Sequence, residues 1–286
     1  MNTQKRIAAI HDISGFGKCS LTVALPIISA AGIECSVMPT AVLSTHTGGF
    51  TGYTYRDLTE DLLPFAKHWQ ANNFHFDGIY SGFLGSTEQI SIVSDIFDMI
   101  SNENTLKIVD PAMADNGKMY AIFNDEFALK MADLCAKADI IVPNFTEAAF
   151  MLGEDFVKPP YTKAYVEGLA KRLSDRCSCD VVLTGVSFDE SKLGAAVYNR
   201  KTGTTDYALT TWISGAYHGT GDVFASVFTA AVIKGKSYKE AIEISAEFVK
   251  NCIIHTQASP NPIKYGVDFE RGLWELAANL RTADDE

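Results

Sequence analysis

The chain has 286 residues, of which 47% are hydrophobic and 21% charged, a composition typical of globular proteins that excludes long disordered stretches. Its 24 Lys and Arg residues against 35 Asp and Glu residues give a net charge of −11. This charge argues against nucleic acid as the main partner, because phosphate contacts require clustered basic residues.

Short β-branched runs alternate with amphipathic stretches of helical length through the first two thirds of the chain. In chain order the pattern predicts strand 6–10, helix 18–31, strand 33–39, helix 55–71, strand 76–83, helix 87–101 with Thr87 as N-cap, strand 106–110, helix 124–137, strand 139–142, helix 162–174 and strand 181–184. These strands lack polar alternation, so we expect both faces of the sheet to be covered. The order indicates a mostly parallel sheet between helices, a three-layer α/β/α sandwich.

The pattern changes after residue 184. It predicts an antiparallel hairpin from strands 195–199 and 205–211, followed by helices 219–233, 237–256 and 269–280. No repeat, low-complexity stretch or linker divides the chain, so we expect residues 1–286 to form one domain.

The six cysteines include no CxxC pair, which disfavours a zinc site. A core of this size does not need disulfides, so we expect reduced cysteines that serve mostly as small core residues. The first seven residues are too polar for a signal peptide, and no apolar run approaches the roughly 18 residues that cross a bilayer. These features together predict a cytoplasmic protein without a membrane span.

A glycine-rich turn, Gly219-Thr220-Gly221-Asp222, opens a predicted helix. Unpaired amides and the positive end of the helix dipole make such a turn an anion site. A carboxylate beside an anion site would repel phosphate unless it has a task, and taking the proton of an attacking hydroxyl is such a task. Asp222 is therefore a candidate catalytic base, with a plain helix cap as the alternative.

Three further predicted strands end in polar residues, namely Asp110, then Asn144 with Glu147, then Thr184 with Gly185. Ligands of open α/β sheets bind outside the carboxyl ends of the strands. The oxygen atoms of Asp110, Asn144 and Glu147 suit Mg²⁺ beside a nucleotide triphosphate. The alternatives are a simple capping box for Asn144 and Glu147, and an ordinary strand-end turn at Thr184.

The glycine-rich segment 14–20 fails the P-loop pattern, because the required positions hold Asp12 and Cys19. It also lacks the spacing of a dinucleotide fingerprint, which disfavours a dehydrogenase. It remains a turn after the first strand that is suited to a small substrate.

The order of these motifs resembles the ribokinase-like superfamily and, within it, the pyridoxal kinases, the vitamin B6 branch. Gly219 to Asp222 carry the likeness to the superfamily, whereas Ser44-Thr45-His46-Thr47-Gly48 and Ser81-Gly82-Phe83-Leu84-Gly85-Ser86 carry the likeness to the branch. The likeness extends from about residue 7 to about residue 280. The resemblance implies a ribokinase-like fold, transfer of the ATP γ-phosphoryl group to the 5′-hydroxyl of pyridoxal, pyridoxine or pyridoxamine, and a homodimer.

The resemblance also implies roles for individual residues. Asp222 would be the base, and the anion hole would come from Gly219, Thr220 and Gly221. The nucleotide site would comprise Asp110, Asn144, Glu147, Thr184 and Gly185, with Asp110 and Glu147 as Mg²⁺ ligands. The vitamer pocket would be lined by Asp12, Ser44, Thr47 and Phe83.

Three positions depart from the B6 kinase pattern. Many B6 kinases have Ser where His11 or Asp12 stands, and the Asp version is closer to the hydroxymethylpyrimidine kinase branch. A kinase for hydroxymethylpyrimidine or another small alcohol is therefore the alternative function, and a vitamer-binding protein is the non-enzyme alternative. Phe83 stands where Tyr is more frequent, and His218 replaces a cysteine that adds to the pyridoxal aldehyde in some members. Lys118 lies in an expected lid loop.

Overall fold

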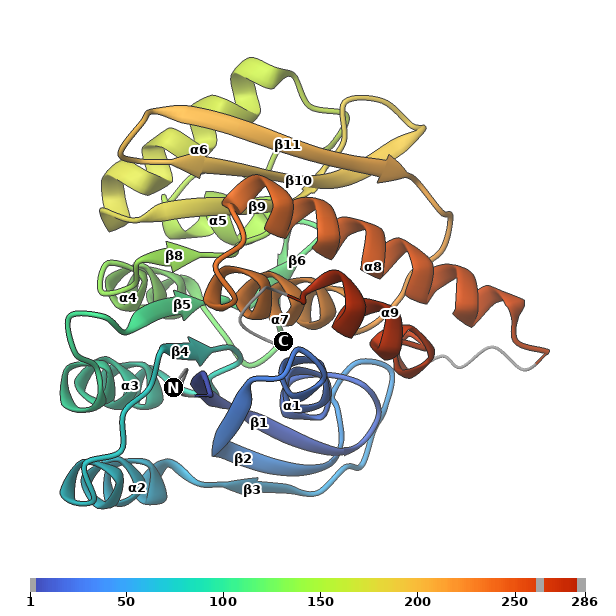
Figure 1. Cartoon of the computed structure of the whole chain (residues 1–286). Coiled ribbons are helices and arrows are strands. Elements are labelled where there is room, and N and C mark those ends of the chain that lie inside the picture. Colours follow the sequence, from blue (N-terminus) through green and yellow to red (C-terminus); the bar gives the residue numbers. More distant parts are fainter. Residues whose placement is uncertain (1–3, 261–264, 282–286) are drawn as a thin grey trace.

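The computed structural model describes residues 4–260 and 265–281. Nine strands form one sheet in the order β11-β10-β9-β8-β5-β4-β1-β2-β3 (Figure 1). All neighbours from β9 to β2 pair in parallel, and β3, β10 and β11 add antiparallel pairs at the two edges. The strand bounds are β1 Arg6–Phe16, β2 Glu34–Thr45, β3 Tyr55–Asp57, β4 Gly78–Ser81, β5 Leu106–Val109, β8 Ile140–Ile141, β9 Asp180–Val186, β10 Lys192–Asn199 and β11 Thr204–Thr211. The mostly parallel sheet and the late hairpin are confirmed.

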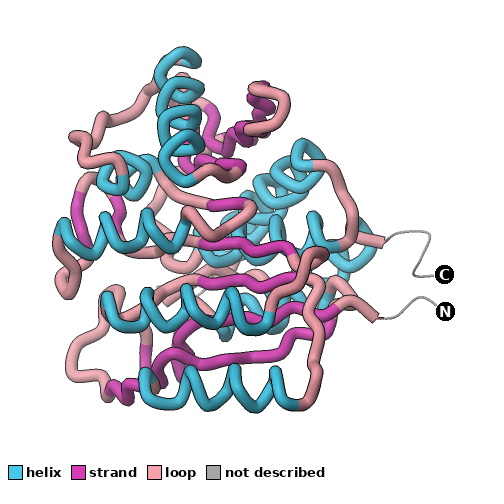
Figure 2. The backbone as a smooth tube through the Cα atoms, turned by 90° about the vertical axis from the view of Figure 1, so that its left-hand side faces the viewer, coloured by secondary structure: helices cyan, strands magenta, loops and turns pink. Residues whose placement is uncertain are grey.

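Helices cover both faces of this sheet, and Figure 2 shows one helix layer in front of the strands. One layer comprises α2 Thr59–Ala71, α3 Thr87–Ile100, α4 Asp125–Cys135, α5 Phe145–Met151 and α6 Lys163–Cys177. The other comprises α1 Leu21–Ala30, α7 Thr220–Ile233, α8 Tyr238–Ala258 and α9 Leu273–Asn279. The predicted three-layer α/β/α architecture is confirmed.

Each helix layer encloses a hydrophobic core of its own. Successive residues of β1 point to opposite faces, so Ala8 and Ile10 pack in the core of the first layer while Ile7 packs in the core of the second. Because both faces are buried, the central strands have no polar alternation. The absence of alternation in the sequence was therefore a correct indication of two covered faces.

Several predicted element boundaries are wrong. β1 and β2 continue to Phe16 and Thr45, beyond the predicted ends at residues 10 and 39, so part of the segment expected as a turn after the first strand belongs to β1. Tyr55–Asp57 is an edge strand that pairs with Ala41–Leu43 of β2, and the helix begins only at Thr59, whose amide donates to Asp57 Oδ1 at 2.7 Å. The N-cap of α3 is Ser86 rather than Thr87, because the Ser86 hydroxyl accepts the Gln89 amide at 3.1 Å. The error at residues 55–57 arises because pairing with β2, not the local sequence, makes them a strand. The error at the start of α3 is one of a single position in a local capping signal.

Three smaller features also differ from expectation. Residues 18–20 are not helical, since Ser20 has φ 54° and α1 begins at Leu21. A short 3₁₀ turn, Glu270–Gly272, precedes α9. The strands β6 Ala114–Asp115 and β7 Lys118–Met119 form a small hairpin that was not predicted, because two-residue strands produce no periodicity.

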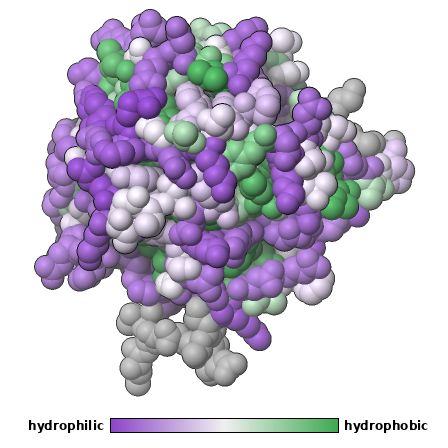
Figure 3. Space-filling view, turned by 90° about the horizontal axis from the view of Figure 1, so that it is seen from above, coloured by the Kyte–Doolittle hydropathy of each residue, from purple (hydrophilic) through white to green (hydrophobic). Residues whose placement is uncertain are grey.

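Seen from above, the molecule is mostly hydrophilic, with hydrophobic side chains in separate small groups (Figure 3).

The six cysteines are free thiols. Four of them are buried, as expected, whereas Cys19 and Cys35 are partly exposed. In residues 4–260 and 265–281 no helix is long and apolar enough to cross a bilayer. Met1–Thr3, part of the segment examined for a signal peptide, lie outside the described residues.

His11 is fully buried in β1, where its ring lies edge-on to Tyr80 with 4.3 Å between the ring centroids. Neither ring nitrogen has a hydrogen-bond partner of good geometry. Burial lowers the pKa of His11 to about 3, partly opposed by the Tyr80 backbone.

We expect His11 to make the protein less stable in acid. A histidine of the unfolded chain titrates near pH 6.5, whereas His11 of the folded protein stays neutral down to about pH 3. The stability that this group contributes is therefore complete above pH 6.5 and decreases as the pH falls toward 3. The free energy of unfolding should drop by about 2 kcal/mol through this group between pH 7.5 and 5. Urea unfolding of wild type and His11→Gln at both pH values measures the difference. Equal losses in the two proteins would contradict this assignment.

Candidate active site

The predicted site residues gather at the carboxyl ends of the parallel strands, where α7 also begins. Asp12 lies in β1, Asp110 follows β5, Asn144 follows β8, and Thr184 lies in β9. Gly219, which precedes α7, packs against the turn after β1, because an added Cβ would lie 2.0 Å from the Lys18 carbonyl oxygen. The turn before α7 therefore lies beside the first strand of the site.

The amino end of α7 has open backbone amides. Gly219 is the N-cap in a left-handed conformation, φ 75°, and no side chain caps the helix. A Cβ at Gly221 would meet nothing within 4 Å, so the turn faces open space. Gly219, rather than Asp222, occupies the N-cap position. The uncapped amides and the helix dipole together favour an anion at this end.

Four buried or partly buried carboxylates interact in a row along this edge. Asp222 interacts electrostatically with Asp12 on one side and Asp110 on the other, and Asp110 interacts with Glu147. Among the described residues, none of the four has a Lys, Arg or His within ion-pair distance. Without basic partners, these carboxyl groups suit cationic or hydrogen-bond-donating ligands.

Burial is the main cause of the raised pKa values of these carboxyl groups. It raises the pKa of Asp222 to about 7, where the Ser20 amide opposes the shift and Asp12 adds to it. Burial and then Asp222 raise the pKa of Asp110 well above its usual range. A carboxyl group that titrates near neutral pH can accept a proton and release it again, as a general base must.

Ser20 joins the first two carboxylates and was missed by the sequence analysis. Its amide lowers the pKa of Asp222, and its hydroxyl lowers the pKa of the buried Asp12, so both favour the ionised carboxylates. Its φ of 54° is rare for a residue other than glycine. Such strain is frequent at functional sites, but a single serine carries no sequence signal for it.

Asn144 and Glu147 form the capping box of α5, so the capping alternative is confirmed. Asn144 Oδ1 accepts the Glu147 amide at 3.0 Å, and Glu147 Oε2 accepts the Asn144 amide at 2.8 Å. Glu147 Oε1 also accepts the Met113 amide at 3.1 Å, and Asn144 Nδ2 donates to the Ala114 carbonyl at 2.8 Å. The pair thus holds the β6 segment over the site.

Asp110 is the member of this group with a carboxylate free to bind a cation. No hydrogen bond to its carboxylate occurs in the described part of the chain, whereas Glu147 already accepts backbone amides with both oxygens. Nor do residues 4–260 and 265–281 contain three His, Cys, Asp or Glu side chains that could enclose a metal ion. This donor set fits Mg²⁺ held by one or two carboxylates, waters and substrate phosphates, rather than a closed protein cage.

Thr184 and Gly185 end β9 next to the capping box. Thr184 forms a parallel bridge with Asn144, and its amide donates to the Pro143 carbonyl at 3.0 Å. Gly185 is exposed with φ 82°, a conformation that favours glycine. The structure therefore brings these two residues to the same edge as Asp110.

The residues expected in the vitamer pocket lie in β1, near the end of β2, and in the loops after β2 and β4. Asp12 is 5% exposed, and burial raises the pKa of its carboxyl group. Ser44 Oγ accepts the Thr54 amide at 2.9 Å, and Thr47 is exposed. The partly exposed Phe83 ring lies 5.5 Å from that of Phe123, which the sequence analysis did not single out.

The lid candidates differ in how they approach the site. Lys118 is exposed on β7 and pairs with Asp115 in the small hairpin. Tyr120 follows directly, and burial together with Glu147 and Asp222 raises the pKa of its hydroxyl. His218 lies against Gly48, since an added Cβ there would be 2.9 Å from its Nδ1. Tyr120 was missed because no sequence pattern places a loop tyrosine over a distant carboxylate.

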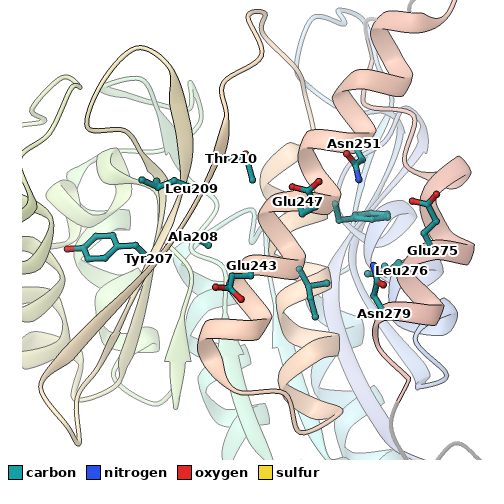
Figure 4. Close-up of a pocket in the computed structure, with 12 residues that line it drawn as sticks. Tyr207, Ala208, Leu209, Thr210, Glu243, Glu247, Asn251, Glu275, Leu276 and Asn279 are labelled. Carbon is teal, nitrogen blue, oxygen red and sulfur yellow. The ribbon is translucent and has the colours of Figure 1, made fainter.

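A separate groove of about 530 Å³ lies between β11, α8 and α9 (Figure 4). None of the predicted site residues lines it. Its charged side chains are Glu243, Glu247 and Glu275. Its lining includes neither a basic side chain nor an open amino end of a helix, so its negative charge would repel phosphate. The groove is therefore not the candidate active site.

The chain matches the phosphomethylpyrimidine kinase family model over residues 25–266. A candidate phosphomethylpyrimidine kinase from Bacteroides thetaiotaomicron, crystallised with pyridoxal, is 36% identical and has a TM-score of 0.90. The match covers 96% of this chain and 96% of that protein. A pyridoxal kinase from Lactobacillus plantarum is 26% identical, with a TM-score of 0.87, over 96% of this chain and 98% of that protein.

Two curated relatives differ in length. A pyridoxal kinase from Pasteurella multocida is 27% identical over 88% of each chain. A bifunctional thiamine biosynthetic enzyme from Arabidopsis thaliana is 24% identical over 82% of this chain, which spans only 43% of that enzyme.

Proposed function

The chain belongs to the phosphomethylpyrimidine kinase family, and from this membership we propose that it transfers the γ-phosphoryl group of ATP to the 5′-hydroxyl of a vitamin B6 vitamer. The vitamers are pyridoxal, pyridoxine and pyridoxamine. This substrate class is supported by relatives that match most of the chain. One of them was crystallised with pyridoxal, and two others are described as pyridoxal kinases.

The observation that carries the proposal is the position of Asp222 in the first turn of the uncapped helix α7. Its carboxylate accepts the proton of the attacking 5′-hydroxyl, and its pKa near 7 suits that task. The amides of Gly219, Thr220 and Gly221 stabilise the negative charge of the phosphoryl group during transfer. Base and anion hole thus come from one turn.

We assign the nucleotide to the neighbouring strand ends. Thr184 and Gly185 contact the nucleotide, and Asn144 with Glu147 holds the β6 segment beside it. Asp110 would hold Mg²⁺, and Glu147 would act through waters, because both its oxygens already accept amides. When bound, Mg²⁺ neutralises charge on the phosphates.

The vitamer would lie on the β1 side of Asp222. Asp12, Ser44 and Thr47 offer polar groups to the ring substituents, and Phe83 stacks on the ring face, supported by Phe123. The residues act within one domain, and a homodimer remains a prediction from the resemblance.

Asp12 supports a second candidate substrate. It is a buried carboxylate without a basic partner in the described structure, and a carboxylate accepts hydrogen bonds from an amino group. A hydroxymethylpyrimidine carries such a group, so its phosphorylation is the alternative within the same family.

A coupled assay of ADP release tests the function. With Mg²⁺ and ATP we expect turnover of at least one B6 vitamer, and chelation of Mg²⁺ by EDTA should abolish it. The comparison set is pyridoxal, pyridoxine, pyridoxamine, hydroxymethylpyrimidine and a reaction without acceptor. A 100-fold preference for the pyrimidine would overturn the vitamer proposal in favour of the alternative. Vitamer binding without any ADP release would indicate a binding protein.

A further inference from the structure

His46 is a buried imidazole whose two ring nitrogens contact two different parts of the chain. Nδ1 accepts the backbone amide of Gly48 at 3.1 Å, and Nε2 lies 3.1 Å from the carbonyl oxygen of Tyr265. The side chain belongs to the motif 44–48, but none of the roles proposed above uses it. It is 5% exposed, so a lost partner would leave a buried polar group unpaired.

These contacts determine the protonation of the ring. An amide can only donate, so Nδ1 carries no proton, and a carbonyl oxygen can only accept, so Nε2 carries one. His46 is therefore the neutral Nε2–H tautomer. Its burial, which lowers its pKa, and the neighbouring ring of His218 at 5.4 Å agree with a neutral imidazole.

Through these bonds His46 connects both substrate-facing loops of the site. On one side it holds Gly48, and with it the adjacent Thr47. On the other side, the Tyr265 carbonyl also accepts the Lys18 amide at 3.0 Å, and the Lys18 carbonyl packs against Gly219. One ring thus links the loop of the vitamer pocket to the turn before the anion hole.

The surrounding glycines show how closely the ring is enclosed. A Cβ at Gly17 would lie 2.2 Å from Cδ2 of His46, and a Cβ at Gly48 would lie 2.9 Å from the ring of His218. Phe50 adds an edge contact with 5.0 Å between ring centroids. The imidazole therefore has one orientation, which a positioning role requires.

Building on the proposed function, we propose that His46 is a positioning residue that holds the 47–49 loop in its vitamer-binding conformation through the Nδ1 bond to Gly48. The Nε2 bond to Tyr265 keeps the ring in the tautomer whose Nδ1 accepts that amide. His46 makes no contact with the reacting atoms. Its loss should therefore affect KM for the vitamer more than kcat or KM for ATP.

Two substitutions separate the two bonds. His46→Gln can donate from the place of Nε2 but has no acceptor at the place of Nδ1, whereas His46→Asn has the reverse pattern. We expect His46→Gln to raise KM for the vitamer about 10-fold, with KM for ATP and kcat within 3-fold of wild type. His46→Asn should keep KM for the vitamer within 3-fold. His75→Gln, an exposed histidine before β4, is the matched control.

Steady-state kinetics, pyridoxal titration without ATP, and thermal unfolding provide the readouts. A vitamer KM for His46→Gln within 3-fold of wild type, or an equal rise in both KM values, would overturn the inference. If His46→Gln does not fold, a 10-fold rise of the vitamer KM in His46→Asn overturns it, and retention of that KM supports it. A wild type that phosphorylates no vitamer contradicts the proposed function, whereas an active wild type with unaffected variants contradicts only the role of His46.

Discussion

Replacing Asp222 by Asn is expected to lower kcat for vitamer phosphorylation by about 10²–10⁴-fold while the fold persists. The amide side chain has the same shape, but it cannot take the proton of the substrate hydroxyl. KM for ATP should change little, because the anion hole uses backbone amides. Steady-state kinetics and circular dichroism of the purified variant measure both effects.

The wild-type enzyme should also show the titration of this carboxyl group. Since burial raises the pKa of Asp222 to about 7, the group is protonated below that pH and cannot act as base. We therefore expect kcat/KM to rise with pH through a midpoint near 7. A flat profile between pH 6 and 8, or unchanged turnover of Asp222→Asn, would reject the assigned role.

Gly219→Ala should reduce activity nearly as strongly, by about 10²–10³-fold, which is the usual effect of losing an anion-hole donor. The φ of 75° costs an alanine about 1–2 kcal/mol, and its Cβ would lie 2.0 Å from the Lys18 carbonyl oxygen. The turn must move to relieve this contact, so its amides no longer face the phosphoryl group. Activity and thermal unfolding should be measured together.

Gly235→Ala is the matched control for this variant. Gly235 follows the other end of α7, has φ 84°, and has open space where a Cβ would be added. It should lose about 1 kcal/mol of stability with activity retained. Equal losses of activity in the two variants would show that general destabilisation, rather than distortion of the anion hole, explains the effect.

Local sequence patterns predicted the structure of the turns before α7 and α5 correctly. The apolar spacing after Asp222 predicts a helix that begins at the glycine turn, and α7 begins at Thr220. The spacing of Asn144 and Glu147 predicts a capping box, which α5 has. Such features depend on residues three or four positions apart, so the sequence contains all the information that they need.

Contacts between distant segments could not be predicted in this way. Tyr55–Asp57 is a strand because β2 offers an edge to pair with, although its own residues continue a helical pattern. The role of His46 depends on Tyr265, which is 219 positions further along the chain. No periodicity within either segment indicates that they meet.

The sequence by itself determined most element types, the mostly parallel sheet and the polar residues that end its strands, because hydrophobic periodicity and turn chemistry are local properties. Only the tertiary structure decided that Asp12, Asp110, Glu147 and Asp222 lie in one row, and that Glu147 is already occupied by backbone amides. The pKa of Asp222 near 7 arises from that burial and proximity. Burial and electrostatic coupling depend on which chain segments pack together, a property that no single segment encodes.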